Sequence, residues 1–278
     1  MSCKLSIIHN LYKRNEFVNE SVKLNLLALD EAKIDYQYIL FNDNGDKDIY
    51  EDIKEFEDKV EYIYSDVNYG HRMCTGGWIG AIPHLKGEYV HNLGQDDVMT
   101  KHFYKNSIEV LDKNSDVYLV FSNGFKVDEK LNPISLMLNP DYFLSKNQAY
   151  YNPLECFKVW FGINSIFYHT GSDVVTCANN NIPAPGTIYR TKLHDLIGEP
   201  DIDNFRGACD FEYFARVIFN EYKCHLIELP NWLYRRSEYS AGNEIIDGKG
   251  NNDYWRKFSL NAIKEKYTKL WEKKCGLS

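Results

Sequence analysis

Short apolar runs separated by amphipathic stretches dominate the first half of the chain. Five runs have the length of buried strands: Leu5–His9, Asp35–Phe41, Val60–Tyr64, Tyr89–Leu93 and Val117–Ser122. Between them, apolar residues recur at helical spacing in the stretches 17–27, 53–56, 75–85 and 102–111. Turn-forming Gly, Asn and Asp residues end several of the runs, so the pattern predicts alternating strands and helices.

This alternation predicts a single Rossmann-like α/β domain with a mostly parallel central sheet and helices on both faces. Ligands of such sheets bind beyond the carboxyl ends of the strands. Polar clusters follow three of the predicted strands, at residues 9–14, 42–46 and 94–97. We therefore expect these clusters to meet at one edge of the sheet and to form a ligand site.

The second half of the chain is less regular. Helices are predicted at Asp210–Asn220 and Tyr254–Lys273, a strand at His225–Leu229, and a loop at Asn139–Asn152. The chain has no internal repeat, low-complexity tract or linker. Residues 1–278 are therefore predicted to form one domain.

Composition narrows the class of partner and the compartment. A formal net charge of −8 disfavours nucleic acid, since non-specific binding to it needs a basic face. Seven cysteines without a Cys-x-x-Cys spacing indicate neither a disulfide framework nor a zinc site. No run is long enough for a transmembrane segment, and no signal peptide is recognisable. We expect a cytoplasmic protein, with peripheral membrane association left open.

The strongest candidate for chemistry is the pair Asp96 and Asp97, directly after the fourth predicted strand. Two adjacent carboxylates repel each other unless solvent or a cation balances their charge. Mg²⁺ or Mn²⁺ bound between these carboxylates and a diphosphate would supply that charge. A solvated helix N-cap is the alternative interpretation of the pair.

Four other positions carry weaker signals. Asp43 follows the second strand, where it could accept a hydrogen bond from a base N–H or simply form a turn. Arg72 follows the third strand and could neutralise a phosphate. Asp210 lies at a helix start, which keeps a carboxylate ionised and able to accept a proton. Arg235 and Arg236 form a basic pair suited to a departing diphosphate.

Taken in order, these segments resemble the family 2 glycosyltransferases, which have the A-type fold, over about residues 4 to 240. The most specific match is NYGHRMCTGGWIGAIPHLKGEYVHNLGQDD, which resembles the family stretch from an Asn-Gly turn to the metal-binding acids. LSIIHNLYKR resembles the first strand and loop, and NDNG the acidic turn that contacts the base. GACDFEYFARV resembles the motif that supplies the catalytic base, and YRRSEYS the late Tyr-Arg segment.

The resemblance implies a role for each matching residue. Asp210 would be the catalytic base, and Asp96 and Asp97 would hold Mn²⁺ or Mg²⁺. Donor contacts would come from Asn10, Tyr12, Asp43, Arg72, Gln95, Asp96, Arg235 and Arg236. Trp160 and His169 are candidates for acceptor contacts within the irregular region.

The resemblance also implies an activity. The chain would be an inverting transferase that moves a sugar from a nucleotide-diphospho-sugar, with UDP favoured, to a hydroxyl of a glycan, lipid-linked or protein-linked acceptor. Residues 1–125 would bind the nucleotide-sugar and residues 126–240 would hold the acceptor and the base. Residues 241–278 would form a helical extension. Polysaccharide biosynthesis is the expected context.

Three departures from the family pattern keep an alternative open. Gly94 replaces the first acid of the metal motif, Cys209 the acid before the base, and Ser237 a late histidine. They motivate a binding protein with a decayed transferase site, against which the retained Asp96 and Asp210 argue. A nucleotidyltransferase would carry a Gly-rich loop after the first strand, and residues 9–14 contain no Gly.

Overall fold

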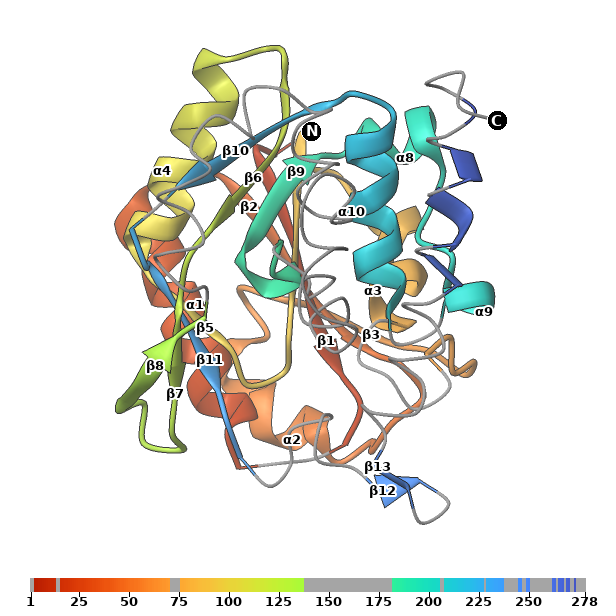
Figure 1. The fold of residues 1–278 in the computed structure, drawn as a ribbon. Helices are drawn as coiled ribbons and strands as arrows, with labels where there is room; N and C mark the ends of the chain where they lie inside the picture. The colour runs from red at the N-terminus through yellow and green to blue at the C-terminus, as the bar shows by residue number, and fades with distance from the viewer. Residues whose placement is uncertain are drawn as a thin grey trace.

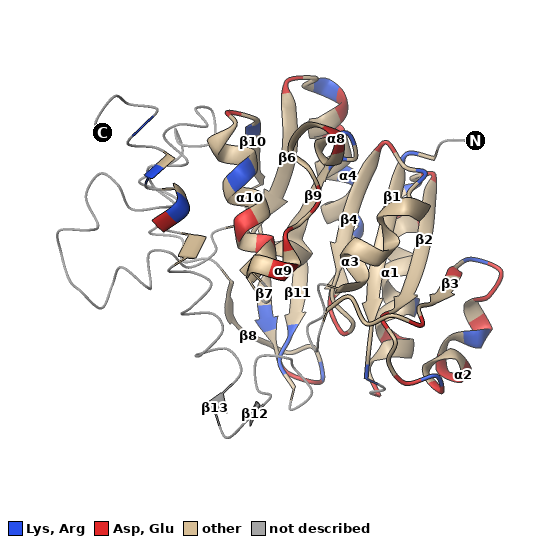
Figure 2. Cartoon of the chain, turned by 90° about the vertical axis from the view of Figure 1, so that its right-hand side faces the viewer, with Lys and Arg blue, Asp and Glu red and all other residues tan. Residues whose placement is uncertain are grey.

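The computed structural model of the protein describes residues 3–13, 16–70, 76–137, 182–205, 208–227, 229–237, 245–246 and 249–250, and the helical positions 262–263, 265–267, 269–270 and 273. A large sheet crosses the middle of the molecule and helices cover both of its faces (Figure 1). The central strands carry few charged residues, which gather instead on the helices and on the ends of the strands (Figure 2).

The large sheet has seven strands in the order β10-β6-β9-β4-β1-β2-β3. They are β1 (Leu5–Leu11), β2 (Tyr36–Asn42), β3 (Glu61–Tyr64), β4 (Tyr89–Leu93), β6 (Val117–Ser122), β9 (Thr187–Arg190) and β10 (Lys223–Ile227). All neighbours pair in parallel except β9, which is antiparallel to both β4 and β6. The predicted mostly parallel α/β fold is confirmed.

A smaller sheet lies beside the large one, in the order β5-β11-β7-β8. Its strands are β5 (Val98–Met99), β7 (Phe125–Val127), β8 (Pro133–Leu136) and β11 (Trp232–Arg235). A short hairpin, β12 (Ile245–Ile246) with β13 (Lys249–Gly250), follows in the chain. Because β5 begins directly after the Asp96-Asp97 pair and β11 ends in Arg235, this sheet sets the position of both segments.

The helices connect these strands. They are α1 (Val18–Ala32), α2 (Ile49–Ile53), η1 (Lys54–Phe56), α3 (Gly76–Ala81), η2 (Ile82–His84), α4 (Lys101–Lys113), η5 (Ala184–Gly186), α8 (Leu193–Ile197), α9 (Ile202–Phe205) and α10 (Cys209–Phe219). Helix α4 is capped by Thr100, whose side chain accepts a hydrogen bond from the backbone N–H of Phe103. None of the helices among the described residues combines the length and apolar character that a membrane crossing needs.

Two hydrophobic cores lie on opposite faces of the large sheet. Alternate residues of β1 divide between them, Leu5 and Ile7 on one face and Ile8 on the other. Helices α1 and α4 cover the first core, and α3 and α10 cover the second. Strands buried on both faces are apolar throughout, which explains why the sequence shows continuous apolar runs rather than alternation.

The structure corrects several predicted boundaries. Strands β4 and β6 have the predicted ends, whereas β1 continues two residues beyond His9 and the late strand ends at Ile227. The short charged helix begins earlier than predicted, at Ile49. The described positions between 262 and 273 are helical, as expected for that segment. The predicted loop Asn139–Asn152 lies outside the described residues.

Candidate functional site

The carboxyl ends of β1, β2 and β4 meet at one edge of the large sheet. The strand register places Leu11 of β1 beside Asn42 of β2, and His9 beside Leu93 of β4. Beyond these ends, the three polar clusters singled out in the sequence come together, as predicted. The fold therefore gathers candidate residues from three segments, the first and last of which lie more than eighty residues apart in the chain, as the hydrogen bond from Tyr12 to Gln95 shows.

Gln95 ties the loop after β1 to the end of β4. Its side-chain carbonyl accepts a hydrogen bond from the backbone N–H of Tyr12 at 2.8 Å, and its amide group donates to the carbonyl of Lys13. The imidazole of His9 bridges the Tyr38 hydroxyl (2.8 Å) and the backbone carbonyl of Gln95 (2.9 Å). Since that carbonyl can only accept, Nε2 of His9 donates and Nδ1 accepts from the Tyr38 hydroxyl. Burial lowers the pKa of His9 to about 4, so this imidazole is neutral at pH 7.

Asn10 presents a buried acceptor to the start of helix α3. Its amide nitrogen donates to Asn92 Oδ1 and to the Leu93 carbonyl, both at 2.7 Å. Its Oδ1 atom is buried and has no hydrogen-bond partner among the residues that the structure describes. A Cβ atom added to Gly77 would lie 2.5 Å from this oxygen, so the glycine permits the close approach of α3. An unsatisfied buried acceptor costs free energy.

Asp43 holds the loop that follows β3. Its two carboxylate oxygens accept hydrogen bonds from the backbone N–H groups of Tyr69 and Gly70, each at 2.8 Å. The side chain is buried, and a Cβ on Gly76 would lie 2.1 Å from Oδ2. The sequence predicted contact of Asp43 with a base N–H. In the structure, each carboxylate oxygen accepts a backbone hydrogen bond, so Asp43 also fixes the loop after β3.

Asp96 and Asp97 lie in different environments. Asp97 is buried, and a Cβ on Gly94 would lie 2.5 Å from its Oδ2 atom, whereas Asp96 keeps part of its surface exposed. Burial raises the pKa of Asp96, against the effect of the nearby Arg235. Burial, and then the neighbouring Asp96 carboxylate, raise the pKa of Asp97 well above its ordinary value. Gly94 is therefore explained sterically, because a side chain there would displace the Asp97 carboxylate.

Arg235 is a buried anchor of this segment. Its Nε donates to the carbonyl of Asp96 (3.2 Å), Nη1 to the carbonyl of Glu129 (2.6 Å) and Nη2 to the carboxylate of Glu20 (2.6 Å). Its backbone N–H points to Asp97 Oδ1 at 3.4 Å. The guanidinium has no exposed surface, so it positions the Asp96-Asp97 turn instead of facing a diphosphate. Sequence reasoning missed Glu20, an acid in the first turn of α1.

The second arginine of the pair has the opposite environment. The side chain of Arg236 is exposed, and its backbone N–H donates to the Val127 carbonyl at 2.9 Å. Strand β11 therefore ends firmly beside β7 while the Arg236 guanidinium reaches solvent. Of the two arginines expected to meet a leaving diphosphate, only Arg236 has the exposure for it.

Asp210 lies in the first turn of α10, and its carboxylate accepts the Phe211 N–H at 2.7 Å. Only residues 220–222 separate α10 from β10, so the helix runs opposite to that strand. Since β10, β6, β4 and β1 point the same way, the start of α10 lies toward their carboxyl ends, at the bottom of Figure 1. The positive end of the helix dipole stabilises the Asp210 carboxylate as the anion.

Three sequence candidates, Arg72, Trp160 and His169, lie outside the described residues. Within the described part of the chain, no group of three or more His, Cys, Asp or Glu side chains could hold a metal ion. Of the two adjacent carboxylates Asp96 and Asp97, only that of Asp96 has the exposure of a metal ligand. Mg²⁺ and Mn²⁺ fit such a site, because Mg²⁺ is commonly bound by one or two carboxylates together with phosphate oxygens and water.

Comparison with known proteins decides the family. The model of glycosyl transferase family 2 matches residues 6–171, which is more than half of the chain. The chain belongs to this family. No curated protein sequence matches this family 2 glycosyltransferase.

Solved structures share the fold of this family 2 glycosyltransferase at low sequence identity. S. aureus TarS 1-349 in complex with UDP-GlcNAc is 15% identical, with a TM-score of 0.54 over 87% of this chain and 62% of that one. The mannosyltransferase PcManGT from Pyrobaculum calidifontis, in complex with GDP-Man and Mn²⁺, is 10% identical, with a TM-score of 0.57 over 87% and 59%. The chain thus spans about three fifths of each structure, and the shared feature is the A-type glycosyltransferase fold.

Proposed function

We propose that this family 2 glycosyltransferase moves a sugar, with inversion, from a nucleotide-diphospho-sugar to a hydroxyl of a glycan or glycoconjugate. The observation that carries the proposal is the sheet edge, where Asn10, Asp43 and Asp96 converge and toward which the start of α10 brings Asp210. UDP is the favoured nucleotide of the donor, and the UDP-GlcNAc bound in the structurally similar TarS supports this choice.

The reaction needs one base and one means of stabilising the leaving group. The acceptor hydroxyl attacks the anomeric carbon opposite the bond to the diphosphate, and the carbon–oxygen bond to the diphosphate breaks. Asp210 takes the proton of the attacking hydroxyl. Arg236 offsets the charge that develops on the departing diphosphate. One base suffices, because inversion needs no covalent intermediate.

A divalent cation has a defined place in this proposal. Asp96 would hold Mn²⁺ or Mg²⁺, which supplies positive charge to the diphosphate. The Mn²⁺ in the PcManGT structure supports this choice of ion. Asp97 would not contact the ion, because its carboxylate is buried against Gly94 and β11.

The first experiment is a thermal-shift screen of UDP, GDP, dTDP and their sugars, with and without Mn²⁺. A ligand that binds only the folded state raises the melting temperature as it saturates the site. We expect UDP and UDP-GlcNAc to stabilise the protein, and Mn²⁺ to increase the shift. If no nucleotide stabilises the protein at millimolar concentration, the donor site is degenerate and a non-catalytic binding protein becomes the better description.

The second experiment tests the base. Asp210→Asn should lower the release of UDP from UDP-GlcNAc, with water or a glycan panel as acceptor, by about 10²- to 10⁴-fold. Donor binding in the thermal-shift screen should remain nearly intact. Asp203→Asn, in an exposed acid at the start of α9, is the matched control and should keep full activity. Full activity of Asp210→Asn would show that Asp210 is not the base.

A further inference from the structure

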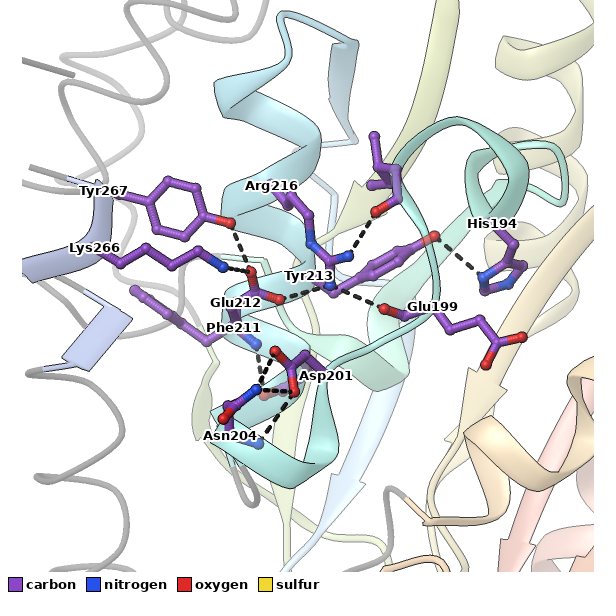
Figure 3. Close-up of polar contacts among 12 residues, drawn as sticks. His194, Glu199, Asp201, Asn204, Phe211, Glu212, Tyr213, Arg216, Lys266 and Tyr267 are labelled. Atoms are coloured by element: carbon purple, nitrogen blue, oxygen red, sulfur yellow. Dashed lines mark hydrogen bonds and ion pairs between the residues drawn. The ribbon is translucent and has the colours of Figure 1, made fainter. Parts of the chain in front are cut away.

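Helix α10 carries a second acid, Glu212, which is completely buried. Its Oε2 atom pairs with Arg216 at 2.7 Å, and its Oε1 atom accepts from Lys266 Nζ at 2.9 Å and from the Tyr267 hydroxyl at 2.7 Å (Figure 3). One carboxylate thus receives three donors, one from α10 itself and two from the helical positions near the end of the chain. Burial and the neighbouring Glu212 raise the pKa of Tyr267 well above its ordinary value, so its hydroxyl remains a donor.

The contacts continue from Arg216, one turn further along the same face of α10, to the segment at the end of α8. Its guanidinium also donates to the carbonyls of Ile197 (2.6 Å) and Glu199 (3.0 Å), at the end of α8. It lies 5.5 Å from the ring centroid of Tyr213. Figure 3 shows this chain of contacts running from the C-terminal helical positions through α10 toward α8. Helix α10 is therefore clamped from two sides at the level of Glu212 and Arg216.

Helical geometry connects this clamp to Asp210. Successive residues of an α-helix are turned by about 100°, so residues two apart lie about 200° apart, on opposite sides of the helix. Glu212 therefore faces away from the side that bears Asp210. A contact that fixes the direction of Glu212 also fixes the rotation of α10, and with it the direction in which the Asp210 carboxylate points.

We propose that Glu212 is the positioning residue of the catalytic site: through Arg216, Lys266 and Tyr267 it locks the rotation of α10 and holds Asp210 toward the acceptor hydroxyl. The inference rests on the proposed function, since it assigns Glu212 a role in the reaction for which Asp210 is the base. Glu212 touches no substrate in this account. Lys266 and Tyr267, more than fifty positions away in the chain, thereby contribute to the geometry of the catalytic site.

The test measures kcat and donor KM separately. Glu212→Gln keeps the shape of the side chain but removes its charge, so the contacts to Arg216 and Lys266 weaken. We expect kcat for UDP-GlcNAc turnover to fall by up to about 10²-fold, the loss that a misplacement of about 1 Å can cause. The KM for the donor should stay unchanged, because the proposed donor contacts lie at the ends of β1, β2, β4 and β11 and not on α10.

A milder variant keeps the experiment decisive if Glu212→Gln folds poorly. Tyr267→Phe removes one hydrogen bond and no charge, and should lower kcat in the same direction by a smaller factor. Combining the two substitutions should add little to the loss of kcat in Glu212→Gln, because both act through the same contact. Glu265→Gln is the control. Glu265 directly precedes Lys266 and forms an exposed ion pair with Lys269, so its substitution should leave kcat and donor KM unchanged.

The possible outcomes separate this inference from the proposed function. If the wild type turns over the donor, and Glu212→Gln and Tyr267→Phe melt at lower temperature yet keep kcat, the cluster only stabilises the fold and the positioning role is overturned. If kcat falls in both variants while donor KM and the control remain as in the wild type, the role is supported. Absence of any donor turnover by the wild type would overturn the proposed function itself.

Discussion

The two sides of the candidate site are held in place by different kinds of contact. At the sheet edge, the loops are fixed by short polar side chains that bond to backbone N–H groups, as Asp43 does with Tyr69 and Gly70. On α10, the fixing contacts join long charged side chains, as Glu212 does with Arg216 and Lys266. The sheet edge needs glycines that let neighbouring chain segments approach closely. The contacts of α10 need side chains from a distant segment of the chain.

This difference has a consequence for how each side responds to change. Contacts to backbone groups depend on the exact path of the chain, so added bulk nearby should damage the sheet edge most. Contacts between charged side chains depend on complementary partners, so loss of a single partner should damage α10 most.

The largest effect is expected from acid. Burial lowers the pKa of both His9 on β1 and His91 on β4 to about 4, from 6.5. Between these values the unfolded chain binds protons that the native protein does not, so stability falls as the pH drops from 6.5 toward 4. Each histidine should account for about 3 kcal/mol over that window. Denaturant unfolding at several pH values measures the slope.

A variant identifies the source of that slope. His9→Gln keeps a neutral group able to bond Tyr38 and the Gln95 carbonyl, but it cannot titrate. Its stability should therefore depend less steeply on pH below 6.5 than that of the wild type, whatever its absolute stability at pH 7. An unchanged slope would show that His9 is not the titrating group.

Gly45→Ala should be the next largest perturbation. A Cβ at this position would lie 1.7 Å from the backbone carbonyl oxygen of Tyr12, which also accepts the Asp46 N–H. Because the obstacle is backbone, the two loops must separate, at a cost of about 3 kcal/mol. Donor binding should weaken with it, as measured by thermal shift with UDP. Gly94→Ala is the comparison, since its Cβ meets only the end of the Asp97 side chain.

Asp43→Asn should have a smaller and more local effect. An amide can accept only one of the two backbone hydrogen bonds and would direct its own N–H group at the other donor. The lost contact should cost about 2 kcal/mol. Hydrogen exchange at the amides of Tyr69 and Gly70 should accelerate while exchange in α10 stays as in the wild type. Faster exchange in both regions would contradict the separate anchoring of the two sides.

Much of the fold was predictable because local pattern and tertiary structure agree. Strands β4 and β6 were predicted to the residue, since each is a buried apolar run between polar turns. Strand β9 was missed because its four residues, Thr187–Arg190, carry no periodicity that distinguishes them from loop. Its position is set by the edges of β4 and β6 that it joins, which no local signal reports.

The convergence of the polar strand ends was predictable from the sequence, but the environments of the candidate residues were not. The sequence placed Asp96 and Asp97 correctly after a strand, but it did not predict β11, the strand that ends in Arg235. It could not show that Asp97 and Arg235 turn inward, because that depends on Glu20 and on the packing of β11 against β5 and β7. In each adjacent pair, Asp96-Asp97 and Arg235-Arg236, long-range contacts bury one residue and leave the other more exposed.

The position of β9 has a consequence for how the chain is made. The strands on either side of it, β4 and β6, end at residues 93 and 122, yet they are joined only by residues 187–190. During synthesis, β4 and β6 must therefore keep their facing edges unpaired until about sixty-five more residues have been added after β6. Open strand edges pair readily with other chains. A chain interrupted before residue 187 is accordingly expected to aggregate, even when strands β1 to β4 have already paired.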